Sequence, residues 1–149
     1  MIAALDAKDA TKLRAMISPN VRTSFGGDSH FDDSLWPELS NVLRLGGSFR
    51  EGMFWTPYVY ANWPESFDAF QYVAAIHDGV PIYAKADANS EVVKRVDWEI
   101  LKLIENKGEW MQVESGWVRS SDVRSPIGYR AGFMKENGEW KLNAFVKGD

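Results

Sequence analysis

The sequence holds one cluster of side chains of the types that bind metals, namely Asp28, His30, Asp32 and Asp33. Alternating oxygen ligands suit Ca²⁺, but the calcium loop of EF-hand proteins also needs a glycine at its sixth position and a glutamate at its twelfth. Neither requirement is met here, and Ca²⁺ does not favour an imidazole ligand. We therefore expect a solvated acidic loop after Gly26-Gly27 and predict no metal site.

His77 is the candidate general base, because Asp78 follows it and a carboxylate can orient an imidazole. A serine nucleophile would complete such a site, yet the Gly-x-Ser-x-Gly elbow of serine hydrolases does not occur. The sequence also has no cysteine, which excludes a cysteine nucleophile, thiolate metal sites and disulfides. We predict no catalytic residues and no cofactor, and hence a protein that is not an enzyme.

The composition is that of an ordinary globular protein. Its 149 residues are 45% hydrophobic and 26% charged, enough for one domain of usual size or two small ones. The formal net charge of −4 argues against nucleic acid as a partner, because phosphate binding needs clustered Lys and Arg. No apolar run reaches the length of a membrane-spanning helix. The segment Met1 to Asp6 lacks the basic and apolar regions of a signal peptide.

The stretch from Val80 to Val123 predicts four or five short strands separated by turns. Its first strand, Val80 to Tyr83, is extended because the residue before a proline avoids the α region. Ile100 to Ile104 forms the most apolar strand, and turns at Asn106 to Gly108 and at Ser115-Gly116 introduce two tryptophan-led strands. Short strands at regular spacing predict a small closed barrel or sandwich.

This pattern resembles the bacterial SH3-like (SH3b) domain. The matching segments are Val80 to Tyr83, Asp87 to Ser90, Val92-Val93, Ile100 to Ile104, Gly108 to Val113 and Gly116 to Val118. The chain departs from the family pattern at Trp98-Glu99, where Lys-Gly is usual, and in its short turn at Glu114 to Gly116. The resemblance implies a small SH3-like β-barrel over residues 72–124 and says little about the ligand.

Aromatic side chains in this segment make the best case for binding. Eukaryotic relatives of this barrel dock extended peptides in an aromatic groove, and the bacterial versions are associated with cell-wall peptides. By position, the resemblance assigns four ligand-binding residues, Tyr83, Trp98, Trp110 and Trp117. Trp98 lies between two acidic residues in a turn and is expected to be exposed. For Trp110 and Trp117 the alternative is that they fill the core of the barrel.

The N-terminal region is predicted to be helical at first and then extended. Residues 1 to 18 show helical spacing, with Asp9 as the N-cap of a second helix. A strand over residues 21–25 and a helix from Leu35 to Leu45 follow. Phe49 to Trp63 is aromatic, too rich in prolines for a helix, and predicted to be extended. The opening resembles nuclear-transport-factor-2-like cone domains, which implies a small-molecule pocket.

After the barrel region, an Asn-Gly turn between alternating strands predicts a β-hairpin. Its strands are Tyr129 to Lys135 and Trp140 to Val146, and Phe133 and Trp140 are expected to pair across it. With this hairpin, nearly the whole chain resembles a family of exported bacterial proteins that contain an SH3b domain. The segments that carry the resemblance are Ser24 to Asp28, Gly46-Gly47, Pro57 to Tyr60, Arg124 to Phe133 and Gly138 to Asp149. It implies a periplasmic or cell-envelope location and no particular activity.

The predicted fold class is α+β, with a small SH3-like β-barrel embedded between an N-terminal helical region and a C-terminal β-hairpin. The predicted regions are residues 1–71, 72–124 and 125–149, packed as one compact unit. The preferred function is a non-enzymatic bacterial envelope protein whose SH3-like module binds a peptide or a peptidoglycan fragment. Two alternatives stay open. One is a scaffold or dimer that uses the aromatic segment 49–63, and the other is a cone-type small-molecule pocket or enzyme with polar groups in its pocket.

Overall fold

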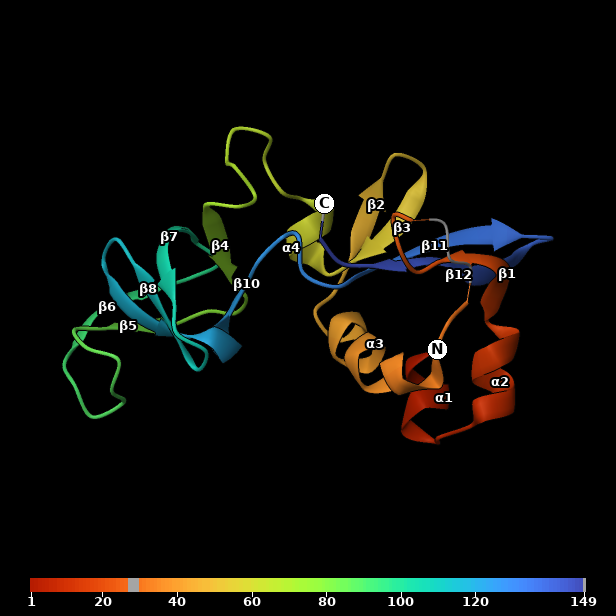
Figure 1. Ribbon diagram of the computed structural model, residues 1–149, viewed down its shortest axis with the longest axis horizontal. Coiled ribbons are helices and arrows are strands. Elements are labelled where there is room, and N and C mark those ends of the chain that lie inside the picture. The colour runs from red at the N-terminus through yellow and green to blue at the C-terminus, as the bar shows by residue number, and fades with distance from the viewer. Residues whose placement is uncertain (27–29, 149) are drawn as a thin grey trace. The chain divides into compact units, whose positions relative to one another are not determined.

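The computed structural model describes residues 1–26 and 30–148 of the chain (Figure 1). Its fold is mixed α+β, as the sequence predicts, with short helices and two β-sheets. The chain divides into two compact units. Residues 1–62 and 127–149 form the first, the discontinuous unit, and residues 63–126 form the second, the inserted unit. No described helix has the length and apolar character needed to cross a membrane.

The discontinuous unit is built on a five-stranded sheet with the strand order β1-β12-β11-β3-β2. Its strands are β1 (Ile17–Arg22), β2 (Ser48–Arg50), β3 (Met53–Thr56), β11 (Arg130–Glu136) and β12 (Glu139–Val146). β1 runs parallel to β12, and the other neighbouring pairs are antiparallel. β1 contains Pro19, which cannot donate to a strand ladder and is tolerated because β1 lies at the edge of the sheet.

The larger helices of this unit lie together on one face of its sheet (Figure 1). They are α1 (Ile2–Asp6), α2 (Ala10–Ala15) and α3 (Trp36–Leu43), with a 3-10 turn η1 (Asp33–Leu35) leading into α3. The Asp9 carboxylate accepts a hydrogen bond from the Lys12 amide at 3.0 Å, which confirms its predicted role as N-cap of α2. Leu39 and Val42 of α3 are fully buried in a core cluster that also contains residues of β11 and β12.

A short helix, α4 (Tyr58–Ala61), corrects the prediction that residues 49–63 are extended throughout. β2 and β3 are extended as expected, but the chain turns helical directly after Pro57. Pro57 occupies the N-cap position of α4, where a proline removes no hydrogen bond of the helix. The proline therefore marks the start of a helix instead of excluding one.

Successive side chains of a strand point to opposite faces, so the two faces of this sheet carry different residues. Ala131 and Phe133 of β11 pack with the core beneath the helices, so Arg130 and Gly132 face the opposite side. A Cβ atom on Gly132 would lie 2.8 Å from the Trp55 ring. Only glycine at this position lets the tryptophan pack directly on the backbone of β11.

The C-terminal hairpin forms as predicted, with β11 and β12 joined at Asn137-Gly138. Both turn residues have positive φ, 51° and 86°, as the two-residue type I′ turn requires. This turn pairs Lys135 with Trp140 and Phe133 with Leu142. The predicted cross-strand pair of Phe133 and Trp140 is therefore wrong, because the length of the turn fixes the register.

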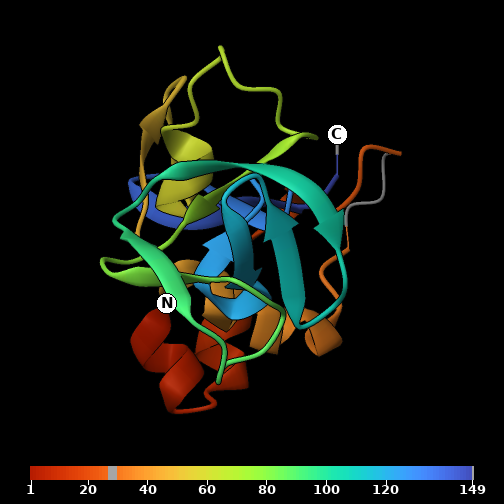
Figure 2. The same cartoon turned by 90° about the vertical axis from the view of Figure 1, so that its left-hand side faces the viewer.

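The inserted unit contains seven strands in the order β10-β4-β7-β8-β9-β5-β6, and Figure 2 shows how strongly they curve. They are β4 (Tyr72–Ala75), β5 (Val80–Tyr83), β6 (Val92–Val96), β7 (Ile100–Asn106), β8 (Trp110–Val113), β9 (Gly116–Arg119) and β10 (Val123–Arg124), with a 3-10 turn η2 (Ser120–Asp122). Their inward side chains form a separate buried core of small aliphatic residues. This core includes Val80, Ile82, Leu101, Val113 and Val118.

The strands predicted between residues 72 and 123 are present, but their closure into a barrel is not confirmed. In the described chain, β10 and β6 are the two edges of an open sheet. β10 has only two residues, and β6 pairs with β5 alone among the described strands. The α+β class is thus established, and the SH3-like barrel is not.

Candidate functional site

An apolar pocket of about 680 Å³ lies in the discontinuous unit. Its walls come from α1, from the residues that follow α2 and α3, and from strands β2, β3, β11 and β12. The larger lining side chains are those of Met16, Leu43, Phe49, Phe54, Phe133 and Trp140. Small-molecule sites in proteins are typically clefts of roughly 300–1,000 Å³ with mainly hydrophobic and aromatic walls. In size and lining, this pocket is of that type.

Two glycines, Gly46 and Gly47, lie shortly after α3 and shape one wall of the pocket. Gly46 has a φ of +69°, a left-handed conformation that ends the helical region as the sequence predicts. A Cβ atom on Gly47 would lie 2.5 Å from the carbonyl oxygen of Trp55 and 2.7 Å from the Phe54 ring. The chain therefore passes close to β3 only because no side chain stands between them, and this close approach holds Phe54 in the wall.

Two aromatic side chains at the mouth of the pocket are largely exposed, Phe49 at 63% and Trp140 at 45%. The Phe49 ring contacts both the Phe54 ring, at a centroid distance of 5.5 Å, and the Trp140 ring, at 6.0 Å. Single exposed apolar residues are common on protein surfaces, whereas a contiguous group beside a cavity indicates a binding surface.

The walls of this pocket offer almost no polar chemistry. Thr56 is the polar side chain among the lining residues. Its hydroxyl lies 2.8 Å from the carbonyl oxygen of Val42 and 2.6 Å from that of Gly46, so it is engaged with the C-terminal end of α3. No charged side chain lines the pocket in the part of the chain that the structure describes. The arrangement is suited to binding an apolar group.

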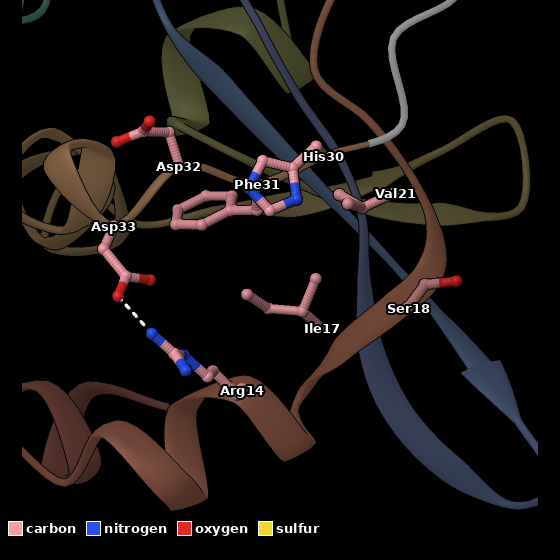
Figure 3. Close-up of a pocket in the computed structure, with 8 residues that line it drawn as sticks. All are labelled: Arg14, Ile17, Ser18, Val21, His30, Phe31, Asp32 and Asp33. Atoms are coloured by element: carbon pink, nitrogen blue, oxygen red, sulfur yellow. Dashed lines mark hydrogen bonds and ion pairs between the residues drawn. The ribbon is translucent and has the colours of Figure 1, made fainter.

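A second pocket, of about 560 Å³, is lined by His30, Asp32 and Asp33 of the candidate acidic cluster (Figure 3). Asp28 lies outside the described residues. Asp33 forms an ion pair with Arg14 and is turned toward it, while Asp32 accepts a hydrogen bond from the Ser34 amide at 2.7 Å. Hydrogen bonds from the Ser34 side chain and from its backbone amide lower the pKa of Asp32. Among the described residues no group of three or more side chains is arranged to hold a metal ion.

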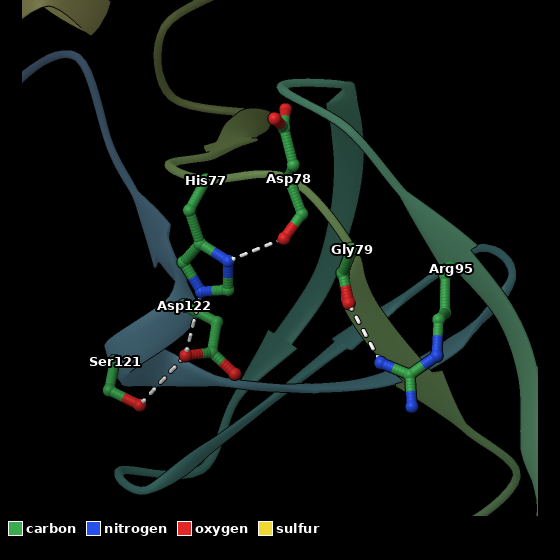
Figure 4. A network of polar contacts seen from close by, with 6 residues as sticks. All are labelled: His77, Asp78, Gly79, Arg95, Ser121 and Asp122. Atoms are coloured by element: carbon green, nitrogen blue, oxygen red, sulfur yellow. Dashed lines mark hydrogen bonds and ion pairs between the residues drawn. The ribbon is translucent and has the colours of Figure 1, made fainter.

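His77 is held by two acceptors, and the carboxylate that contacts its ring belongs to Asp122 instead of the predicted Asp78 (Figure 4). Its Nδ1 lies 2.9 Å from the backbone carbonyl oxygen of Asp78, and its Nε2 lies 3.3 Å from Oδ1 of Asp122. The Ser121 hydroxyl bonds to Asp122 at 3.4 Å, not to the imidazole. Both ring nitrogens can donate at once only in the protonated ring, so these two bonds favour the protonated form and raise the pKa of His77. The same two contacts fix the orientation of the ring.

Three of the four predicted binding residues come together on the outward face of β5, β8 and β9. Ile82 and Val118 point into the core, so their neighbours Tyr83 and Trp117 point outward, and the two are direct partners across β5 and β9. The Trp110 ring lies edge-on to Tyr83 at 5.3 Å. All three aromatic side chains are half-buried.

Two cations flank these aromatic residues. The guanidinium of Arg119 lies 4.8 Å from the centre of the Trp110 ring, and the ammonium of Lys107 lies 5.4 Å from that of Trp117. Trp98, the fourth predicted residue, occupies the turn between β6 and β7, where it is 48% exposed and has a φ of +52°. It lies outside the three strands that carry the others, and the role of all four as ligand-binding residues stays a prediction.

Comparisons of the chain with protein-family models, with curated proteins and with solved structures find no match. The resemblances to SH3b domains and to cone domains therefore stay predictions. Function has to be argued from the geometry of the sites themselves.

Sequence reasoning did not assign the apolar pocket residues or the Asp122 partner of His77. Phe49 and Phe54 lie in the aromatic stretch 49–63. The many large rings of this stretch, just after Gly46-Gly47, are the feature of the sequence that could have indicated the pocket. Nothing near His77 in the sequence indicates Asp122, because β10 pairing with β4 brings this distant segment alongside.

Proposed function

We propose that the discontinuous unit binds a small apolar molecule in the pocket between its helices and its sheet. The observation that carries the proposal is the pocket of about 680 Å³ with apolar walls and two exposed aromatic rings at its mouth. Transfer of apolar ligand surface from water into such a site contributes about 25 cal/mol per Å². Offset by the cost of immobilising the ligand, this supports roughly micromolar affinity.

The chemical class of the ligand follows from the charges and hydrogen-bonding groups that the pocket walls offer. An ionised group on the ligand would lose its hydration without gaining a counter-charge from the described side chains of the walls, which is strongly unfavourable. The Thr56 hydroxyl hydrogen is already directed at two backbone carbonyl oxygens, so it is not free to donate to a ligand. We therefore expect an uncharged, ring-bearing or chain-like apolar molecule, bound without chemical change.

A fluorescent titration tests this proposal with N-phenyl-1-naphthylamine, an uncharged aromatic probe. The Ala3→Trp variant places an indole at the pocket wall and is expected to weaken binding at least tenfold. Ala10→Trp is the matched control, because Ala10 is exposed on the neighbouring helix α2 and does not line the pocket. Equal affinity of the two variants and the wild type would contradict the proposal.

The same samples separate ligand binding from self-association through segment 49–63. Phe49 belongs to that segment and is exposed, so a dimer surface there would hide the mouth of the pocket. Light scattering over the concentrations used in the titration gives the mass. A mass that rises with concentration and falls back when probe is added would favour the dimer surface, whereas a constant monomer mass with saturable binding supports the ligand pocket.

A second candidate function rests on the aromatic face of the inserted unit. We propose that Tyr83, Trp110 and Trp117, with Arg119 and Lys107, dock an extended peptide or a cell-wall peptide fragment. The adjacency of three half-buried rings and two cations on one outward sheet face favours it. The SH3b resemblance of residues 80–118 supports the same activity, and with it a non-enzymatic role in the bacterial periplasm or envelope.

Titration with muropeptides, followed by NMR, tests this second function. The indole N–H signals of Trp110 and Trp117 are expected to shift, and Trp117→Ala is expected to weaken binding about tenfold. Trp140, in the other unit, is the internal reference and should not move. A titration that leaves the inserted unit silent contradicts peptide docking and leaves the apolar pocket proposal unaffected.

A further inference from the structure

Three arginines lie on the sheet face of the discontinuous unit that is turned away from helices α1, α2 and α3. Arg22 follows the core residue Val21 at the end of β1, and Arg130 precedes the core residue Ala131 at the start of β11. Alternation therefore directs both arginines to the opposite face. Arg50 ends β2, the edge strand next to β3 on the same sheet.

Aromatic rings connect these arginines in an alternating series. The Arg130 guanidinium lies 4.8 Å from the centre of the Tyr60 ring and 5.7 Å from that of Phe25. Arg50 lies 5.3 Å from the same Tyr60 ring, and Arg22 lies 5.2 Å from the same Phe25 ring. Stacking against rings fixes the plane of a guanidinium while leaving its N–H groups, which lie in that plane, available to a ligand.

Arg130, at the centre of the series, is a buried cation without a counter-charge in the described chain. It is only 5% exposed, and its Nε and Nη1 atoms have no hydrogen-bond partner among the residues that the structure describes. The Arg50 Nη1 donates to the Tyr60 carbonyl oxygen at 3.2 Å, and its Nε lies 3.8 Å from the exposed Glu51. No described carboxylate pairs with Arg22 or Arg130. Buried charges in proteins are normally paired and hydrogen-bonded, because desolvation without compensation is costly.

We propose that Arg130 is the centre of a binding site for an oxyanion, the carboxylate or phosphate group of a small ligand. Both groups accept charge-assisted hydrogen bonds from guanidinium N–H donors. Phe25, which stacks on Arg130, is 51% exposed, so rotation of an exposed ring opens the guanidinium to the solvent. Arg22 and Arg50 attract the anion and contribute secondary contacts. The site is distinct from the apolar pocket, which lies on the other face of the sheet.

Thermal unfolding in the presence of anions tests the site. Inorganic phosphate and sodium acetate are added separately, with sodium chloride keeping the ionic strength constant. A ligand at tenfold its Kd is expected to raise the Tm of the full chain by about 4 °C. A shift with phosphate alone identifies a phosphate group as the ligand, a shift with acetate alone identifies a carboxylate, and a shift with both shows that the site accepts either group. Each of these results supports the site, and no shift with either anion overturns it.

Two variants assign the effect to Arg130. Arg130→Met removes the charge at similar volume and is expected to abolish the Tm shift, whereas Arg44→Met, at an exposed arginine paired with Asp6, should retain it in full. An equal shift in Arg130→Met and wild type would overturn the proposal. If Arg130→Met does not fold, the Nε–H NMR signal of Arg130 in the wild type decides. Phosphate or acetate should move that signal, and an unmoved signal contradicts binding at this side chain.

Discussion

Phe49 and Trp140 lie against each other with their ring centres 6.0 Å apart, although one belongs to β2 and the other to β12. The contact spans the sheet of the discontinuous unit and closes one side of the pocket mouth. Neither ring is buried by it, which is unusual for two large aromatic side chains in contact. The pair is held in place by local packing and remains open to the solvent, as a ligand-facing surface requires.

Removal of Trp140 should affect ligand binding much more than folding. The Trp140→Ala variant is expected to weaken probe binding about tenfold, because it removes contact area at the mouth, and to change the free energy of unfolding by less than about 1 kcal/mol. Trp98→Ala is the matched control, since Trp98 is exposed to a similar degree but lies in the other unit. Equal loss of binding in both variants would contradict the assignment. Fluorescence titration and urea unfolding give the two quantities.

A side chain at Gly47 should be poorly tolerated. Gly47→Ala places a Cβ atom 2.5 Å from a backbone oxygen of β3, which cannot move without distorting the strand. We expect a loss of about 1–3 kcal/mol in the free energy of unfolding, typical of overpacking. Gly52→Ala is the control, because its Cβ atom meets open space and the cost is limited to the left-handed φ of +81°. A smaller loss at Gly47 than at Gly52 would refute the close-approach argument.

The imidazole of His77 should titrate above its ordinary pKa of about 6.5. A group whose pKa is raised by folding stabilises the folded state fully at pH values below the unfolded pKa. That stabilisation is lost as the pH rises through the folded pKa, so the effect disappears toward alkaline pH. Because His77 is half exposed, solvent screening keeps the contribution small.

An NMR titration of the His77 ring protons measures this pKa, which the bond to the Asp78 carbonyl raises most, and Asp122→Asn tests the additional contribution of the Asp122 carboxylate. The variant removes the charge of the partner carboxylate and should bring the pKa of His77 down toward its ordinary value, while the bond to the Asp78 carbonyl stays. A pKa of His77 at or below 6.5 in the wild type would contradict the geometry described for the ring.

Phe145 should be the most costly side chain to truncate in the core of the discontinuous unit. It is fully buried, stacks on Tyr129 at a centroid distance of 4.9 Å and contacts Phe31 at 5.8 Å. Phe145→Ala is expected to lower the free energy of unfolding by about 3–5 kcal/mol. Met134→Ala, at an exposed position of β11, should cost less than about 1 kcal/mol. Similar losses in the two variants would show that the core is placed incorrectly.

Most of the local structure of the inserted unit can be predicted from the sequence. Its strands are short and separated by polar or glycine-bearing turns, so β-branched residues such as Val92 and Val118 lie in strands where they were expected. The Asn137-Gly138 turn was equally clear, because its preference for positive φ is intrinsic to those two residues. Strands and turns of this kind depend on residues that are close together in the chain, and the sequence therefore predicts them.

The candidate sites depend on contacts between segments far apart in the chain, so they are harder to predict from the sequence. The apolar pocket needs residues from α1, β3 and the C-terminal hairpin at once, and nothing in the sequence states which strands pair. Arg130 looks like any strand-end arginine until the structure shows it buried between two rings. The SH3b resemblance predicts four aromatic binding residues by their position, of which Tyr83, Trp110 and Trp117 lie on β5, β8 and β9, whereas Trp98 lies in a separate turn.

The discontinuous course of the chain also has a consequence for the order of folding. β3 must pair with β11, and their partners Thr56 and Ala131 are separated by the whole inserted unit. Within that unit, β4 and β10 are antiparallel neighbours, with Ala74 opposite Arg124. Prior folding of the inserted unit therefore shortens the effective loop that β3 and β11 must close by roughly threefold, which lowers the entropic barrier by about 1 kcal/mol. During synthesis, the pocket is therefore completed only when β11 and β12 insert between β1 and β3, which precede them in the chain.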